Sequence, residues 1–188
     1  MVNPHEDPLE LVSSRHDEWV DRFIDERDRL RDLLTEHGYW HTVERIHHVG
    51  STAVPGLEAK DIVDIDIVVS KDAVFDVSRL IETELGGSRT ENSPTWHPVF
   101  RSVDGQRFND HVFASSCPEW KVSVVTRDVL RARPSHRREY TRLKRQLLLE
   151  NSSLEAYSVG KTAFMEELLS IAHEDAFFEY PFEIPRLG

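Results

Sequence analysis

Residues 49–67 read VGSTAVPGLEAKDIVDIDI and decide the fold. Their last part is rich in β-branched residues, with acids two apart, which predicts a strand over 61–69. Residues two apart in a strand point to the same face, so Asp64 and Asp66 share one face, and the isoleucine between them points to the other. Two neighbouring carboxylates repel each other unless a cation lies between them. The pattern therefore favours a Mg²⁺ (or Mn²⁺) site, against the alternative of acids on a solvated strand face.

The dipeptide Gly50-Ser51, which precedes this strand, indicates a phosphate-binding turn beside the metal site. Gly50 lets the backbone approach a ligand closely, and Ser51 offers N–H and hydroxyl donors to phosphate oxygens. Twelve residues separate Ser51 from Asp64. This arrangement is similar to the signature of the nucleotidyltransferase superfamily. We therefore expect Gly50, Ser51 and Thr52 to bind phosphate, and Asp64 and Asp66 to act as catalytic metal ligands.

The rest of the chain surrounds this segment with helices and a few strands. Apolar residues at helical spacing predict helices over 15–37, 71–85, 119–132, 135–149 and 154–178. Extended patterns predict further strands over 42–49, 97–103 and 107–114. Ser13 or Ser14 is the expected cap of the first helix. We expect an α+β fold with a mixed sheet and flanking helices. It forms one domain over 1–188, with the sheet core in 1–118 and a helical part in 119–188.

The composition of the chain limits the classes of ligand and partner that it is expected to bind. The chain has 188 residues and a formal charge of -11, which disfavours extended nucleic-acid binding. It carries only five lysines against eighteen arginines. No apolar run has the length of a signal peptide or a membrane span, so we expect a cytoplasmic protein without a membrane partner. The expected ligands are a nucleoside triphosphate, as its metal complex, and an unidentified acceptor.

A third carboxylate would complete a two-metal site, and residues 108–113, FNDHVF, offer a candidate. Neighbours in a strand point to opposite faces, so either Asp110 or His111 faces the site. Asp110 would be a metal ligand. His111 would be a catalytic residue, either a metal ligand or a base that titrates near neutrality, unless it is only hydrogen-bonded within the sheet.

Several basic residues are candidates for phosphate contacts. His48 bonds either a phosphate or the loop backbone, and Lys60 reaches a phosphate unless it is simply exposed. Arg127 and Arg131 lie four apart on one helix face. With Lys161 they form a cationic wall opposite the acids, unless their charges are used in ion pairs within the helices.

Several further motifs in the sequence resemble those of the GrpB family, also called UPF0157, over about residues 15–175. The matching segments are HVGSTAVPGL at 48–57, FNDHVF at 108–113, RDVLR at 127–131, Tyr140 with Lys144, and Tyr157 with Gly160 and Lys161. Two positions depart from the usual family pattern: Asp61 replaces a proline and Val129 replaces an aromatic residue.

The resemblance implies a nucleotidyltransferase-like fold, and it places His111 at the family's histidine. Some members are fused to a dephospho-CoA kinase domain. The expected activity is transfer of a nucleotidyl group from a nucleoside triphosphate to a small-molecule or protein acceptor. The alternative is a non-catalytic regulatory module of the same fold that binds a nucleotide or a CoA-type ligand. Phosphohydrolysis at the same metals is a third, weaker hypothesis.

Overall fold

A five-stranded mixed sheet lies at the centre of the computed structural model, which describes residues 10–150 and 154–186. Its strands are β1 (Val43–Val49), β2 (Ile62–Val69), β3 (Ser88–Arg89), β4 (Trp96–Val103) and β5 (Gln106–Ala114). Their order across the sheet is β1-β2-β5-β4-β3. Strands β2 and β5 are parallel, and the other neighbours are antiparallel. The expected mixed α+β architecture is confirmed.

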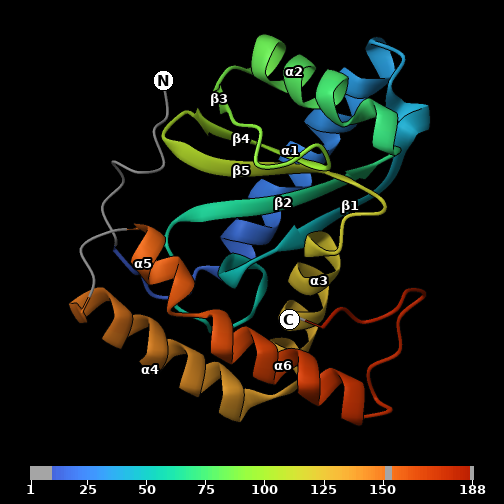
Figure 1. The fold of residues 1–188 in the computed structure, drawn as a ribbon. Coiled ribbons are helices and arrows are strands. Elements are labelled where there is room, and N and C mark those ends of the chain that lie inside the picture. The colour runs from blue at the N-terminus through green and yellow to red at the C-terminus, as the bar shows by residue number, and fades with distance from the viewer. Residues whose placement is uncertain (1–9, 151–153, 187–188) are drawn as a thin grey trace.

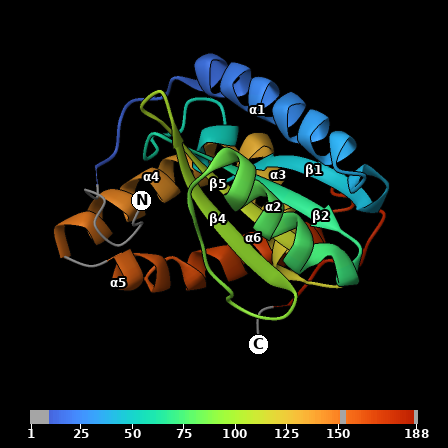
Figure 2. The same cartoon turned by 90° about the horizontal axis from the view of Figure 1, so that it is seen from above.

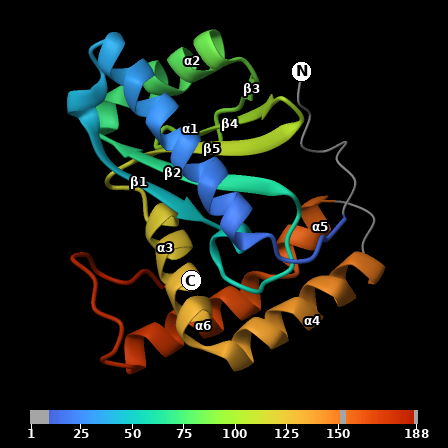
Figure 3. The same ribbon diagram turned by 180° about the vertical axis from the view of Figure 1, so that it is seen from behind.

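Helices cover both faces of the sheet (Figures 1 and 2). They are α1 (His16–Glu36), α2 (Val74–Leu85), α3 (Glu119–Ala132), α4 (Pro134–Glu150), α5 (Leu154–Val159) and α6 (Thr162–Glu174). Helices α1 and α2 lie on one side of the sheet, and α3, α4 and α6 lie on the other, as the view from behind also shows (Figure 3). The helical part of the chain therefore faces one side of β2 and β5.

Two apolar clusters hold these layers together. The first joins the sheet to α1 and α2, and includes Trp19, Leu30, Ile65, Ile67 and Val77. The second joins α3 to α6, and includes Val125, Val129, Leu130, Leu168 and Leu169. Burying each such side chain contributes about 1.5–3 kcal/mol. Val129 is fully buried in the second cluster, so its departure from the family pattern lies in the core.

Two local expectations were wrong, and one short strand was missed. Neither Ser13 nor Ser14 caps α1; Arg15 holds the cap position without a side-chain bond, and the Ser14 hydroxyl accepts from the N–H of Gly56 at 3.2 Å. The expected helix over 154–178 is divided between α5 and α6 at Gly160, because glycine is unfavourable in helix interiors, and a Cβ atom here would lie 2.4 Å from a Leu147 methyl. The short strand β3 was not expected, since two residues carry no periodicity.

The start of α1 is fixed to the entrance of β2 through Asp61. Its carboxylate accepts hydrogen bonds of 2.8 Å from both Trp19 Nε1 and Arg22, and another from Arg15 at 2.5 Å. Burial acts to raise the pKa of this carboxyl, but these donors together lower it. The residue that replaces the family's proline therefore provides a polar anchor between two distant segments.

In the described part of the chain, no helix combines the length and apolar character needed to span a membrane. The expectation about export rests partly on residues 1–9, which lie outside the described residues.

Candidate functional site

A cavity of 420 Å³ lies between the sheet and the helical part. Its walls come from the loop after β1, from β2 and β5, and from α3 to α6. The polar and aromatic residues on these walls include Gly50 with Ser51 and Thr52, Lys60, Asp64, Asp66, Asn109, His111, Ser123, Arg127, Tyr140, Lys144, Tyr157 and Lys161. Most of the site residues expected from the sequence therefore line one cavity.

The two acids of β2 lie in different environments. Asp64 Oδ1 accepts a 2.8 Å hydrogen bond from Asn109 and lies 3.9 Å from His111 Nε2. Burial acts to raise the pKa of Asp64, but His111, Asn109 and the nearby Lys60 outweigh it and lower the pKa. Asp64 is therefore an ionised carboxylate at neutral pH.

Asp66 is fully buried, and neither of its oxygens has a hydrogen-bond partner among the described residues. Burial, with a smaller contribution from the charge of Asp64, raises its pKa to about 7. His111 and, more weakly, Ser123 and Arg127 oppose that rise. A buried carboxylate without donors costs free energy, so a cation that coordinated it would relieve the cost.

The strand register decides which residue of β5 accompanies these acids. Asp66 pairs with His111 across the parallel ladder, so the two side chains share the face that borders the cavity. Burial acts to lower the pKa of His111, but Asp64 and Asp66 raise it overall. On the other side of the ring, Trp96 Nε1 donates to Nδ1 at 3.3 Å, which leaves Nε2 directed at Asp64.

Asp110 does not join the site. It pairs with Ile65 on the opposite face of the sheet and is fully buried there. Its Oδ2 accepts a 2.5 Å hydrogen bond from Arg101 Nε, and Arg101 also donates to Glu26 of α1. The expectation that Asp110 holds metal with Asp64 and Asp66 is corrected, because strand alternation sends it to the far side of the sheet.

The glycine of the loop is required by its closeness to Asp64. Gly50 has φ +70° and ψ -168°, a conformation that only glycine adopts readily. A Cβ atom at this position would lie 2.3 Å from Asp64 Oδ2. The loop backbone thus lies against the carboxylate, as a site that holds a phosphate and a metal ion side by side requires.

We expect Gly50→Ala to lower the free energy of unfolding by about 2 kcal/mol or more, because backbone strain and a steric clash act together. Gly56→Ala is a matched control, since Gly56 also has a positive φ of 73° but has no atom within 4 Å of a built Cβ. Urea unfolding of both variants measures the difference. Equal losses would contradict a tight Gly50–Asp64 contact.

His48 and Thr52 fix the loop from inside. His48 Nε2 and Thr52 Oγ1 are 3.0 Å apart, and the imidazole stacks on Phe23 with ring centroids 4.9 Å apart. Burial lowers the pKa of His48 to about 4, so the ring is neutral. Of the two roles considered for His48, the contacts match the fixing of the loop backbone. Thr52 does border the cavity, although its hydroxyl is used in this bond.

The two arginines of α3 also hold this loop. Arg131 Nε donates to the carbonyl of Ala53 at 2.8 Å, and Arg127 donates to the carbonyl of His48 at 2.9 Å. Arg131 is not among the residues that line the cavity, whereas Arg127 is. The structure thus gives Arg131 a contact with the loop backbone outside the cavity wall, and its expected phosphate contact stays a prediction.

Three of the five lysines of the chain line the cavity: Lys60, Lys144 and Lys161. None of them has a carboxylate within 4 Å among the described residues, although this chain has an excess of acids. Burial, and then Lys161, lowers the pKa of Lys144 to about 7. Burial, and then Lys60, lowers the pKa of Lys161 to about 8. Three lysines that line one cavity, with no described carboxylate in direct ion-pair contact, favour the binding of an anion.

Lys144 and the tyrosines beside the lysines matched the family pattern in the sequence but were not expected as site residues. Lys144 is only 2 % exposed; its ammonium group donates to Ser51 Oγ at 3.2 Å and to the carbonyl of Glu58, and lies 4.8 Å from the Tyr140 ring centre. Lys161 lies 4.5 Å from the ring centre of Tyr157. The signal was present: lysine is rare here, and Lys144 follows Tyr140 by four residues on one helix face.

The residues present fit a divalent metal ion. Asp64 and Asp66 supply hard oxygen ligands on one strand face, Asp66 lacks any other partner in the described structure, and His111 adds a nitrogen beside them. Mg²⁺ typically takes one or two carboxylates together with substrate phosphates. The donor set of the cavity matches that pattern.

Comparisons with known proteins agree with one another. The family model described as GrpB protein matches residues 8–170. A UPF0157 protein of Halalkalibacterium halodurans is 32% identical over 176 residues, covering 92% of this chain and 86% of the relative. The glutamate-rich protein GrpB of Alkalihalophilus pseudofirmus is 28% identical over 177 residues, covering 86% of this chain and 95% of the relative.

A solved structure has the same fold. The crystal structure of the conserved protein GrpB from Enterococcus faecalis matches with a TM-score of 0.69 and 24% identity, covering 85% of this chain and 94% of that one. At this identity the likeness concerns the fold alone. Together with the family model, which spans most of the sequence, these matches mean that the chain belongs to the GrpB family.

Proposed function

We propose that this protein is a metal-dependent nucleotidyltransferase that transfers a nucleotidyl group from a nucleoside triphosphate to a small-molecule or protein acceptor. One observation carries the proposal: two carboxylates on one strand face, of which Asp66 is fully buried without a hydrogen-bond partner among the described residues, border the same cavity as three lysines. A nucleoside triphosphate with Mg²⁺ complements both, because the metal ion neutralises the acids while the phosphate oxygens neutralise the lysines.

The arrangement around Gly50 supports placing the fold in the nucleotidyltransferase-like superfamily. The Gly50–Ser51 turn follows β1 directly, and β1 pairs with β2, so Val49 lies opposite Asp64 in the ladder. The phosphate loop and the metal-binding strand of the signature are therefore adjacent, with Gly50 in contact distance of Asp64. The twelve residues between Ser51 and Asp64 therefore contain the connection that returns the chain to a strand beside β1.

In this proposal, each part of the cavity has one task. Asp64 and Asp66 would hold Mg²⁺, which would supply charge neutralisation for the phosphate oxygens. Ser51, Lys60 and Lys161 hold the phosphates, with Lys144 positioning Ser51. The acceptor oxygen forms a new bond to the α-phosphorus, and a hydroxyl acceptor gives its proton to water. The bond from that phosphorus to the α–β bridging oxygen breaks, and pyrophosphate leaves with the electron pair of this bond. Positioning and charge neutralisation supply most of the catalysis.

The alternative is a binding module that holds a nucleotide or a CoA-type ligand without turnover. The position of Asp110 favours it, because no third carboxylate accompanies Asp64 and Asp66 on the cavity face among the described residues. His111 stands where that carboxylate would be expected. The two functions differ only in turnover, so binding has to be established first and turnover measured second.

Asp64→Asn should remove the effect of Mg²⁺ on nucleotide affinity while leaving the protein folded. Isothermal titration with each of the four nucleoside triphosphates, with Mg²⁺ and with a chelator, measures this effect. Circular dichroism checks the fold. An unchanged Mg²⁺-dependent affinity in the variant would remove Asp64 from the site.

Lys161→Met should weaken triphosphate binding by about 10- to 100-fold, the range expected for losing one charged hydrogen bond. The matched control is Lys71→Met, since Lys71 is exposed and lies outside the cavity. Affinities at two salt concentrations should show a shallower salt dependence for Lys161→Met than for the control. Equal affinities of the two variants would show that the phosphates do not lie against Lys161.

Turnover is tested with α-labelled nucleotides, Mg²⁺ or Mn²⁺ and a small-metabolite extract. Release of pyrophosphate with transfer of the label identifies a nucleotidyltransferase. Release of labelled monophosphate without an acceptor identifies a phosphohydrolase. Metal-dependent binding of nucleotides without either product supports the binding module.

A further inference from the structure

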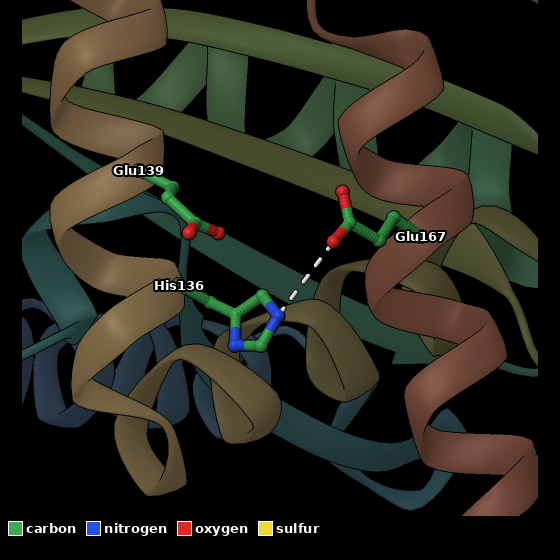
Figure 4. Close-up of side chains that lie close together, drawn as sticks. All are labelled: His136, Glu139 and Glu167. Atoms are coloured by element: carbon green, nitrogen blue, oxygen red, sulfur yellow. Dashed lines mark ion pairs between the residues drawn. The ribbon is translucent and has the colours of Figure 1, made fainter.

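Helices α4 and α6 carry a second group of potential metal ligands, outside the cavity. His136 and Glu139 lie on α4 and Glu167 on α6, and one ligand atom from each lies within 4.8 Å of the other two. His136 Nε2 is 3.6 Å from a Glu167 oxygen. Figure 4 shows the three side chains directed into the space between the two helices. None of the three lines the cavity described above.

We propose that these residues bind a divalent transition-metal ion of the Zn²⁺ type, which fastens α4 to α6. An imidazole nitrogen together with carboxylate oxygens suits Zn²⁺, Ni²⁺ or Cu²⁺, whereas Mg²⁺ and Ca²⁺ prefer oxygen ligands alone. Positions i and i+3 of a helix share a face, so His136 and Glu139 can hold one ion together. Glu167 supplies the third ligand across the helix pair, and water completes the shell.

The charge of the cluster supports a cation. Two carboxylates face one imidazole, so the group keeps a negative charge even when the ring is protonated. Arg142 offsets this charge only in part, since its guanidinium lies 3.9 Å from Glu139 and is 76% exposed. A divalent ion would neutralise both carboxylates and remove their mutual repulsion.

The backbone beneath the cluster is well fixed. Arg137 donates to the carbonyls of Leu130 and Arg131, which joins the start of α4 to the end of α3. One turn further on, Tyr140 of α4 stacks on Phe164 of α6, with ring centroids 5.2 Å apart. Contacts on both sides of the cluster therefore fix the positions of the two helices that carry the ligands.

The side chains need only a small adjustment to close around an ion. Bonds of about 2.0–2.2 Å in a tetrahedron place ligand atoms about 3.4 Å apart. The contact between His136 and Glu167 already approaches that distance. The glutamate side chains are 45% and 53% exposed, so rotation about their own bonds can bring the remaining atoms together.

The test uses the full-length protein with Asp64 and Asp66 both replaced by asparagine, so that the cavity does not compete for metal. Titration with ZnCl₂ should show one equivalent bound. It should raise Tm by about 5–10 °C at a free Zn²⁺ concentration a hundredfold above Kd. His136→Ala should abolish both effects, and Glu167→Gln should weaken binding at least tenfold. Mg²⁺ should give neither effect.

His173→Ala is the matched control, because His173 is an exposed histidine near the end of the same helix, α6. It should bind Zn²⁺ like its parent. The proposal is overturned if the parent binds no Zn²⁺, or if His136→Ala and His173→Ala bind it equally well. Glu167→Gln keeps the test decisive if His136→Ala fails to fold. The result does not depend on whether the cavity binds a nucleotide.

Discussion

Arg101→Met should lower the free energy of unfolding by about 3–5 kcal/mol at neutral pH, which is the usual effect of removing one partner from a buried ion pair. Arg101 is fully buried between two strands and α1. It donates at 2.5 Å to both Asp110 and Glu26, which are also buried. Without the guanidinium, two carboxyl groups would remain in the core without a counter-charge.

The loss should depend on pH. In the variant, burial without a cation raises both carboxyl pKa values above those in the unfolded chain, which are about 4. The penalty is then absent below about pH 4 and complete once the pH exceeds the raised values. Urea unfolding of both proteins from pH 4 to pH 8 should therefore show a gap that widens as the pH rises.

Two controls make this result specific to Arg101. Arg79→Met replaces an exposed arginine of α2 and should change stability by no more than about 0.5 kcal/mol. Replacing Glu26, Arg101 and Asp110 together with apolar residues should restore much of the loss, because no buried charge then remains. A loss that did not vary with pH would indicate that packing, and not charge, explains the effect.

This ion group also shows where the sequence was informative and where it was not. The alternation in FNDHVF correctly predicted that only one of Asp110 and His111 could face the acids of β2. It could not decide between them, because that depends on the register between β2 and β5, which distant contacts set. Asp110 is paired with Arg101 of the neighbouring strand, and Arg101 in turn bonds Glu26, which lies 75 residues from Arg101 in the sequence.

The basic residues show the same difference between positions that local sequence predicts and positions that distant contacts decide. The local spacing of Gly50, Ser51, Asp64 and Asp66 was enough to expect one site, because strand geometry and a short loop determine their positions. Lys144 is 93 residues from Ser51, and only the packing of α4 against the loop brings the two together. Arg131 shared a helix face with Arg127 as expected, yet its guanidinium reaches the loop backbone instead of the cavity.

Asp66→Asn should make the ligand-free protein more stable at pH 8, by about 1–3 kcal/mol. The pKa of Asp66 in the folded protein is about 7, well above its ordinary value of 3.8. Ionising the group therefore costs stability: the cost is absent below about pH 4, grows as the pH rises towards 7 and is complete above it. Each pKa unit corresponds to 1.36 kcal/mol. The asparagine amide is also buried without hydrogen-bond partners, and this cost reduces the stability gained by removing the carboxylate.

Asp64→Asn is the matched comparison, on the same strand face two residues away. The pKa of Asp64 is lowered in the folded protein, so its ionised form adds stability above the pKa of the unfolded chain, about 4, and that stability is lost as the pH falls. Its replacement should therefore destabilise the protein at pH 8. The two substitutions are alike chemically, yet we expect opposite signs because only Asp64 has donors for its charge.

Urea unfolding at pH 8 and pH 5, with and without Mg²⁺ and a nucleoside triphosphate, measures both signs. Ligands that bind the folded state should stabilise the wild type and have little effect on Asp66→Asn. A less stable Asp66→Asn at pH 8 would mean that the charge of Asp66 is already compensated within the fold. A more stable variant that no longer binds metal would mean that the chain keeps a costly carboxylate because of what it binds.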